Sequence, residues 1–340
     1  MTDKRNGSVL TRNDNQGFPG LRVRPYQLLC VVCSLAENAP AACVEQAGDI
    51  LACVRKTPDI PITLLCNAGE VFAYQDPGTD GDTPEGVEFN MKRDLEILYR
   101  LNLMPGCTLP ARIIFNRLFD TIEDTIEICC FQTATSPAWR GCLRAHCDAY
   151  VKGRARGIGA IIPSRDGGEM IVQKRESMAA VCKPGPKNVR PHILLCAVCQ
   201  YGGGTRPPYP EDNLPELIEL VLKEPDTPIT VVPHADWMMC APCPNREPGL
   251  NACVANKGSG GLPNQMRDLR VLQKIGLTFG STMKARDLFR LLFERIPGTF
   301  EMCHIKHAKP SVWWTGCGSA VADSENFAKG KKLLVDKLGL

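Results

Sequence analysis

The chain carries one sequence pattern twice, and this internal repeat limits its fold more than any other feature. Residues 24–33 (RPYQLLCVVC) match residues 190–199 (RPHILLCAVC) at an offset of 166 positions. Further matches follow along the chain, and their offset rises only to 175 positions. They are Pro58 with Pro225, Arg93 with Arg267, Ala111 with Ala285, Cys129 with Cys303 and Cys142 with Cys317. Offsets that drift only where loops differ in length predict a tandem duplication, so we expect two homologous units.

The repeat divides the 340 residues into four segments. Residues 1–23 form a polar N-terminal segment, and residues 24–153 form the first unit. Residues 154–189 are rich in glycine, proline and charge, which is typical of a linker. The second unit then occupies residues 190–340.

Each unit begins with the pattern of a βαβ core. A short apolar run, at residues 27–32 in the first unit and 193–198 in the second, predicts a buried strand. A helix is expected to follow, most clearly at residues 212–222, and residues 227–232 predict a second strand. A strand, a helix and a strand in this order indicate a crossover with parallel strands.

Two helices are expected after this core. Residues 266–275 place apolar side chains at spacings of three, and residues 282–295 carry a leucine stripe. The cysteine-bearing tail of each unit is mostly loop. The predicted fold class is therefore α/β, with two tandem homologous units that each contain a βαβ core, two or more helices and a cysteine-rich loop tail.

Eighteen cysteines set this composition apart. The polar start, residues 1–17, lacks the apolar core of a signal peptide, which indicates a cytoplasmic protein. Thiols stay reduced in the cytosol, so the cysteines predict metal ligation or thiol chemistry rather than a disulfide framework. A net charge of +3 gives no case for nucleic acid, and no apolar run approaches the roughly 18–20 residues of a membrane span.

The second unit contains the strongest metal-binding signal. Cys240 and Cys243 form a C-x-x-C-P motif in a loop just past a predicted strand, and thiolates at this spacing can both face one metal. Cys253 follows ten residues later, and Cys303 and Cys317 lie further on. We expect Cys240, Cys243 and Cys303 to be ligands, with Cys253 or Cys317 as the fourth.

An iron–sulfur cluster is favoured over zinc at this site. A thiol-rich ligand set suits both metals. A proline directly after a ligating cysteine recurs in ferredoxin-type sequences, as Pro244 does here. Structural zinc sites usually contain two close cysteine pairs, whereas this loop contains only Cys240 with Cys243. The expected cofactor is a [4Fe–4S] cluster, with zinc as the alternative.

The first unit lacks three of these thiols. The stretches that align with the C-x-x-C-P motif and with Cys253, at residues 73–76 and 80–86, contain no cysteine. We therefore expect a degenerate metal site in the first unit. The alternative is a second cluster, built from Cys129, Cys130, Cys142 and Cys147.

Two further pairs, Cys30 with Cys33 and Cys196 with Cys199, lie inside or at the end of the apolar runs that predict strands. On a strand, residues three apart point to opposite faces, so one member of each pair is expected in the core. The alternative is a thioredoxin-like redox pair.

Histidines also lie close to cysteines along the chain. His192 precedes Cys196, and His304 and His307 follow Cys303. Each is a candidate for a metal ligand or a proton donor, and the alternative for each is a structural role.

Several of these motifs together resemble a known family. R-P-H-x-L-L-C at residues 190–196, C-x-x-C-P at residues 240–244 and F-E-x-C at residues 300–303 resemble the prokaryotic family called domain of unknown function 1284. Its members are described as predicted iron–sulfur or metal-binding proteins. The resemblance implies a cytoplasmic metal-binding module, with the carried-over positions Cys240, Cys243, Cys253, Cys303 and Cys317.

The chain departs from the family at one point. The family has another cysteine soon after F-E-x-C, where this chain has Lys306 and His307. This departure leaves the fourth ligand open.

Three hypotheses for function follow. The first is an iron–sulfur protein that transfers electrons to a redox partner, or acts as a Lewis acid on a small molecule in a groove between the units. The second is a zinc-stabilised interaction module without catalysis. The third is a thiol–disulfide or thiol-transfer protein that uses Cys196 and Cys199. In each case the two units are expected to pack as an internal pseudo-dimer, so the chain can act as a monomer.

Overall fold

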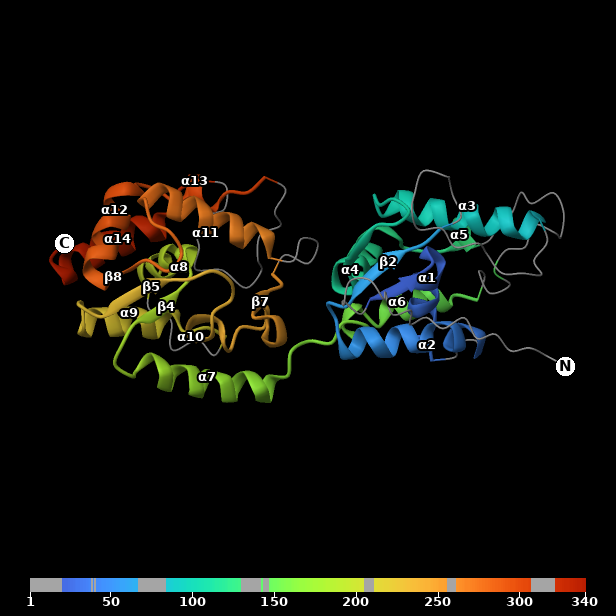
Figure 1. Cartoon of the computed structure of the whole chain (residues 1–340), viewed down its shortest axis with the longest axis horizontal. Coiled ribbons are helices and arrows are strands. Elements are labelled where there is room, and N and C mark those ends of the chain that lie inside the picture. The colour runs from blue at the N-terminus through green and yellow to red at the C-terminus, as the bar shows by residue number, and fades with distance from the viewer. Residues whose placement is uncertain are drawn as a thin grey trace. The chain divides into compact units, whose positions relative to one another are not determined.

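The computed structural model describes two compact units, Met1–Ser164 and Arg165–Leu340, which we refer to as unit 1 and unit 2 (Figure 1). The described residues are 20–37, 39, 41–66, 84–129, 142, 147–204, 211–255, 261–306 and 322–340, with the backbone alone for 41–46. Both units mix helices with a small sheet, so the α/β class is confirmed. Across the described ranges, no helix is both long and apolar enough to cross a membrane.

Unit 1 is built on a three-stranded sheet. Strand β2 (Pro61–Leu64) lies between β1 (Leu21–Val23), which runs parallel to it, and β3 (Thr108–Pro110), which runs antiparallel. Side chains along β2 alternate between buried and half-buried, as a sheet with one covered face requires. The helices are α1 (Pro25–Cys33), α2 (Ala41–Lys56), α3 (Pro84–Arg100), α4 (Ala111–Thr121), α5 (Ile126–Cys129) and α6 (Ala149–Ala155), with the short 3-10 helix η1 (Ile158–Ala160).

Unit 2 has a sheet with the same order and directions. Strand β5 (Pro228–Val231) lies between the parallel β4 (Lys187–Val189) and the antiparallel β8 (Thr282–Lys284). Its helices are α7 (Gly167–Val181), α8 (Pro191–Gly202), α9 (Leu214–Lys223), α10 (Trp237–Cys240), α11 (Leu262–Ile275), α12 (Ala285–Arg295), α13 (Phe300–Cys303) and α14 (Glu325–Leu338), with η2 (Pro248–Leu250) inside the hairpin of β6 (Arg246–Glu247) and β7 (Ala252–Cys253).

The first apolar run of each unit is a helix, so its prediction as a strand is wrong. Residues 27–32 lie in α1 and residues 193–198 lie in α8. A continuous apolar run is compatible with a buried helix as well as a buried strand. Proline at the first helical position decides for the helix, because its fixed φ suits that position and its missing N–H is not needed there. The parallel strand is the preceding three residues, and two helices make the crossover to the next strand.

Residues 154–189 are folded, so their prediction as a linker is wrong. They include α7 and β4, and α7 packs against α10 of unit 2 (Figure 1). Asp166 caps α7 by accepting a hydrogen bond from the backbone N–H of Glu169 at 2.7 Å. The boundary between the units falls after Ser164, ahead of this helix.

The later helices lie close to where the leucine spacings place them. Helix α11 ends at Ile275 as predicted and begins at Leu262, four residues before the predicted start. Residues 282–284 form β8, so α12 covers only 285–295 of the predicted segment. Each unit has its own hydrophobic core: α14 packs on α8 in unit 2, and α6 packs on α1 in unit 1.

Candidate metal centre

The C-x-x-C-P motif of unit 2 forms a tight turn at the end of a short helix. Asp236 caps α10 by accepting from the backbone N–H of Met238 at 2.7 Å, and α10 ends at Cys240. The backbone N–H of Cys243 donates to the carbonyl oxygen of Cys240 at 2.9 Å. The backbone N–H of Arg246 donates in turn to Cys243 at 3.0 Å, which continues the turn into β6.

The hairpin of β6 and β7 returns Cys253 to this turn. Cys253 pairs with Arg246 across the two strands, and the backbone N–H of Val254 donates to the carbonyl of Asn245 at 2.8 Å. Gly261 closes the loop with φ +79, and any side chain there would clash with the carbonyl oxygen of Cys253. The structure therefore places Cys240, Cys243 and Cys253 in one loop region.

The three thiols lie close enough to affect each other's ionisation. Burial is the largest cause that raises the pKa of Cys240 well above its ordinary value. The neighbouring Cys243 and Cys253 raise this pKa further. Burial also raises the pKa of Cys243 to about 12, with a further contribution from Cys253. At neutral pH these two thiols are protonated, and a bound cation is needed to hold them as thiolates.

Arg165 anchors the cysteine turn and supplies positive charge to it. Its Nη1 donates to the carbonyl oxygens of Ala241 at 2.6 Å and Cys243 at 2.8 Å. The side chain is 6% exposed, and its buried Nε has no hydrogen-bond partner in the part of the chain that the structure describes. Its charge opposes the rise in the pKa of Cys243. A buried cation with a spare donor beside a thiol loop suits an anionic thiolate centre.

A second buried arginine lies near the thiols. Arg190, only 1% exposed, donates from Nε and Nη2 to Oδ2 of Asp268 at 2.9 and 2.6 Å. Its charge opposes the rise in the pKa of Cys240. The Arg190–Asp268 pair thus fixes the start of α8 on α11 and directs positive charge toward the cysteine loop.

His192 is held inside the protein by the same carboxylate. Its backbone N–H and its Nδ1 lie 3.1 and 2.6 Å from Oδ1 of Asp268. Burial lowers the pKa of His192, against the opposing effect of Asp268. The ring is therefore neutral at pH 7 with its proton on Nδ1, because a carboxylate only accepts. Such a residue positions the helix start rather than releasing protons to solvent.

Cys303 is joined to the cysteine loop through two side chains. Arg267 donates from Nε to the carbonyl oxygen of Cys303 at 2.9 Å and from Nη1 to Oδ1 of Asn264 at 2.6 Å. Nδ2 of Asn264 donates to the sulfur of Cys253 at 3.4 Å. This relay ties the end of α13 to the loop, and it gives one of the thiols a hydrogen-bond donor.

The remaining candidates of unit 2 are placed only in part. The ring of His304 stacks on Phe300 with centroids 4.9 Å apart, and its carbonyl accepts from Arg270. Cys317 and His307 lie outside the described residues, so the choice of the fourth ligand stays open.

In unit 1, the predicted set is brought together only in part. Cys147 is exposed, and Cys130 lies outside the described residues. Cys129 and Cys142 line one cavity, together with Cys30 and Cys33 of α1. Sequence reasoning missed this grouping, although these four positions are the ones at which both halves of the repeat carry cysteine.

The C-x-x-C pairs on α1 and α8 share a helix face, so the expectation of opposite faces is wrong. Cys196 lies in the middle of α8 and Cys199 in its second half, and Cys199 is buried. A reactive thiol pair is favoured at a helix N-terminus, where the dipole stabilises a thiolate. This placement does not favour the thiol-transfer hypothesis.

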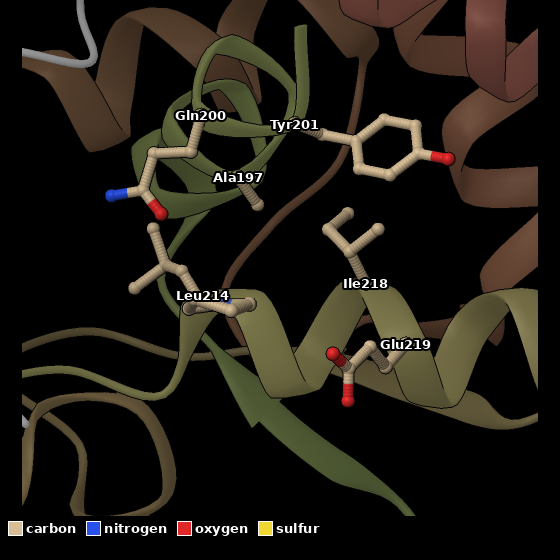
Figure 2. A pocket seen from close by; sticks show the side chains of 7 residues that line it. Ala197, Gln200, Tyr201, Leu214, Ile218 and Glu219 are labelled. Atoms are coloured by element: carbon tan, nitrogen blue, oxygen red, sulfur yellow. The ribbon is translucent and has the colours of Figure 1, made fainter. Parts of the chain in front are cut away.

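A separate small cavity lies between α8 and α9 of unit 2. Figure 2 shows Gln200 beside Leu214 at one end, and Tyr201 above Ile218 at the other. The volume is about 20 Å³, and no thiol is among the described residues that line it. This cavity is therefore distinct in chemistry from the cysteine loop.

Within the described part of the chain, no group of three or more His, Cys, Asp or Glu side chains is already arranged to hold a metal ion. Comparisons of the chain with protein-family models, with curated proteins and with solved structures give no match.

Proposed function

We propose that the protein binds an iron–sulfur cluster in unit 2 and uses it for electron transfer. Cys240, Cys243 and Cys253 are the proposed ligands, with Cys303 or Cys317 as the fourth. When bound, such a cluster gains and releases single electrons, at a potential that its surroundings set. With four thiolates every iron is fully ligated, which favours electron transfer. A three-thiolate set would favour Lewis-acid chemistry on a small molecule instead.

The observation that carries this proposal is that three thiols share one loop region with two buried arginines nearby. Burial raises the pKa values of Cys240 and Cys243, so the loop gains its thiolates only when a cation binds. Arg165 and Arg190 offset the negative charge that four thiolates bring. Asn264 adds a hydrogen bond to a sulfur, the kind of contact that tunes a cluster potential.

We also infer that the two units arose by duplication. The support is their shared strand order, and the matching pairs Thr63–Thr108 and Thr230–Thr282, whose hydroxyls are 2.7 Å apart in both units. We place the protein in the cytoplasm, because many thiols and a cluster both require reducing conditions.

Purification without oxygen, followed by counts of iron, sulfide and zinc and a visible spectrum, tests the proposal. We expect a brown protein that loses about four irons when Cys240 and Cys243 are both changed to serine. Cys182→Ser is the matched control in unit 2, because Cys182 is exposed at the end of α7. A colourless protein with one zinc would contradict the proposal and favour the interaction module.

A further inference from the structure

The cavity of unit 1 is lined by four cysteines from three parts of the chain. Cys30 and Cys33 lie on one face of α1, Cys129 ends α5, and Cys142 follows in a loop. The backbone N–H of Cys142 donates to the carbonyl oxygen of Cys129 at 2.7 Å, so these two cysteines are adjacent. Four is the number of thiolates that a metal centre of this kind takes, and here four thiols line one small space.

Most of the residues that line the cavity lie in helices. Helix α6 contributes Ala149 and Tyr150 to its lining. It approaches α1 closely because it has Gly153 at the crossing, where any side chain would clash with the carbonyl oxygen of Val32. The hydroxyl of Tyr150 donates to the carbonyl of Ile122 at 3.0 Å, so the ring offers the cavity an apolar face. Helices that hold the thiols in place favour a defined site over a chance gathering of cysteines.

Arg93 supplies positive charge to the same cavity. It lines the cavity and is only 9% exposed, and its buried Nε has no hydrogen-bond partner among the described residues. Its guanidinium lies 4.0 Å from the centre of the Tyr26 ring, which also lines the cavity. An unpartnered donor on a buried cation is unfavourable unless an anion accepts from it. An anionic centre with four thiolates provides such an acceptor.

The placement of the thiols around the cavity favours a cluster over a single ion. A tetrahedral zinc site with zinc–sulfur bonds of about 2.3 Å needs sulfurs about 3.8 Å apart. Here the thiols line a cavity of about 30 Å³, and within the described residues no three of them are placed to hold one metal ion. A cluster places several atoms between its four thiolates and so fits thiols that surround a space.

We propose that unit 1 holds its own iron–sulfur cluster, of the [4Fe–4S] class, ligated by Cys30, Cys33, Cys129 and Cys142, with Arg93 beside it. This inference rests on the cavity and is independent of the proposed function of unit 2. The chain then carries two clusters and binds about eight irons. The site replaces both sequence-based expectations for unit 1, the degenerate site and the set that includes Cys147.

The test uses the full chain, purified without oxygen, in a background that removes the proposed cluster of unit 2. We expect the Cys240→Ser/Cys243→Ser chain to keep about four irons and four sulfides, and the further change Cys33→Ser to remove at least three-quarters of them. Cys147→Ser and Cys53→Ser are the matched controls, because neither residue lines the cavity. Both controls are expected to keep the iron.

Each of the other possible results supports or overturns a specific proposal. A background chain without iron overturns the cluster of unit 1 and leaves the proposed function standing. Iron that survives in the background but is lost with Cys147→Ser overturns this ligand set. Iron that is unaffected by the serine changes at 240 and 243 but lost with Cys33→Ser supports this inference and contradicts the proposed function. One zinc in place of iron overturns the cluster.

A second measurement needs no variant and so does not depend on how a variant folds. The intact protein is treated with iodoacetamide before and after iron is removed by a chelator, and labelled peptides are counted by mass spectrometry. We expect labelling of Cys30, Cys33, Cys129 and Cys142 to rise at least fivefold on iron removal, while exposed Cys147 is labelled equally in both states. Equal labelling of the four cysteines in both states would overturn the proposal.

Discussion

Units 1 and 2 share a buried arginine–aspartate pair but differ in what they place beside it. Arg24 binds Asp94 and Arg190 binds Asp268, each with a nitrogen–oxygen contact of 2.6–2.7 Å just before a helix that begins with proline. Two residues after the arginine, unit 1 has Tyr26, whereas unit 2 has His192.

The second arginine of each unit shows a similar difference. Arg93 lies over the Tyr26 ring and lines the four-cysteine cavity, whereas its counterpart Arg267 donates to the carbonyl oxygen of Cys303. Both arginines also bind an asparagine three residues earlier, Asn90 and Asn264. The comparison teaches that one scaffold, held by the same buried ion pair, supports two different arrangements of thiols.

Removing the aspartate of either ion pair is expected to have the largest effect on stability. Asp94→Asn and Asp268→Asn each leave a buried arginine without its counter-charge, and such a loss costs about 3–5 kcal/mol. The loss is expected to be larger in unit 2, because Asp268 also binds Nδ1 of His192 at 2.6 Å. Hydrogen exchange of peptides from α1 and α8, read by mass spectrometry, reports the two units separately.

Equal losses in both units would show that His192 adds nothing to the pair. A loss below about 1 kcal/mol in either unit would contradict the structural role given to the pair.

The close helix crossings give the next largest expected effect. Gly153 of α6 and Gly330 of α14 lie against the carbonyl oxygens of Val32 and Val198, so alanine at either position pushes two helices apart. Overpacking of this kind costs about 1–3 kcal/mol, and we expect similar losses in both units by thermal unfolding. Gly48→Ala is the control, because nothing surrounds that position in α2, and alanine there is expected to stabilise by about 0.5–1 kcal/mol. Stabilisation by Gly330→Ala would contradict the crossing.

The smallest expected effect is a pH dependence of folding stability that differs between the two units. Burial lowers the pKa of His192, so the unfolded chain takes up a proton that folded unit 2 resists. The stability that the neutral His192 ring contributes to the folded state is therefore complete above the unfolded pKa of about 6.5. It is lost as pH falls toward the lower pKa of the folded state. Asp268 acts against the shift, and the charges of Arg190 and Arg267 reinforce it.

Hydrogen exchange at pH 7.5 and pH 5.5 measures this effect. Peptides of α8 are expected to lose protection at the lower pH, and His192→Phe is expected to remove most of that loss. Peptides of α1, which has Tyr26 at the matching position, provide the internal control. An equal loss in both units would contradict the role of His192.

Local sequence patterns account for the predictions that succeed. The apolar stretch at 227–232, the leucine spacings and the C-x-x-C-P motif place β5, the helices from 266 and 282 onward, and the cysteine loop at 240–253 close to where they lie. The first strand is misplaced in each unit. A helix and a strand that are buried on all sides both have a continuous apolar sequence, so this pattern cannot distinguish them.

That one error also hides the cavity of unit 1. On a strand, Cys30 and Cys33 point to opposite faces, whereas on α1 they share one face and meet Cys129 and Cys142. The contacts of Arg165 with the cysteine turn are likewise absent from the prediction, because they join residues about 76–78 positions apart through an apparent linker. Contacts of this range depend on the tertiary fold, which local patterns do not encode.

The iron and sulfide content of the chain, purified without oxygen, tests the account most directly. We predict about eight irons and eight sulfides, falling to about four when Cys240 and Cys243 are both changed to serine. A protein without iron and sulfide, whether it holds zinc or no metal, would contradict the account of both units.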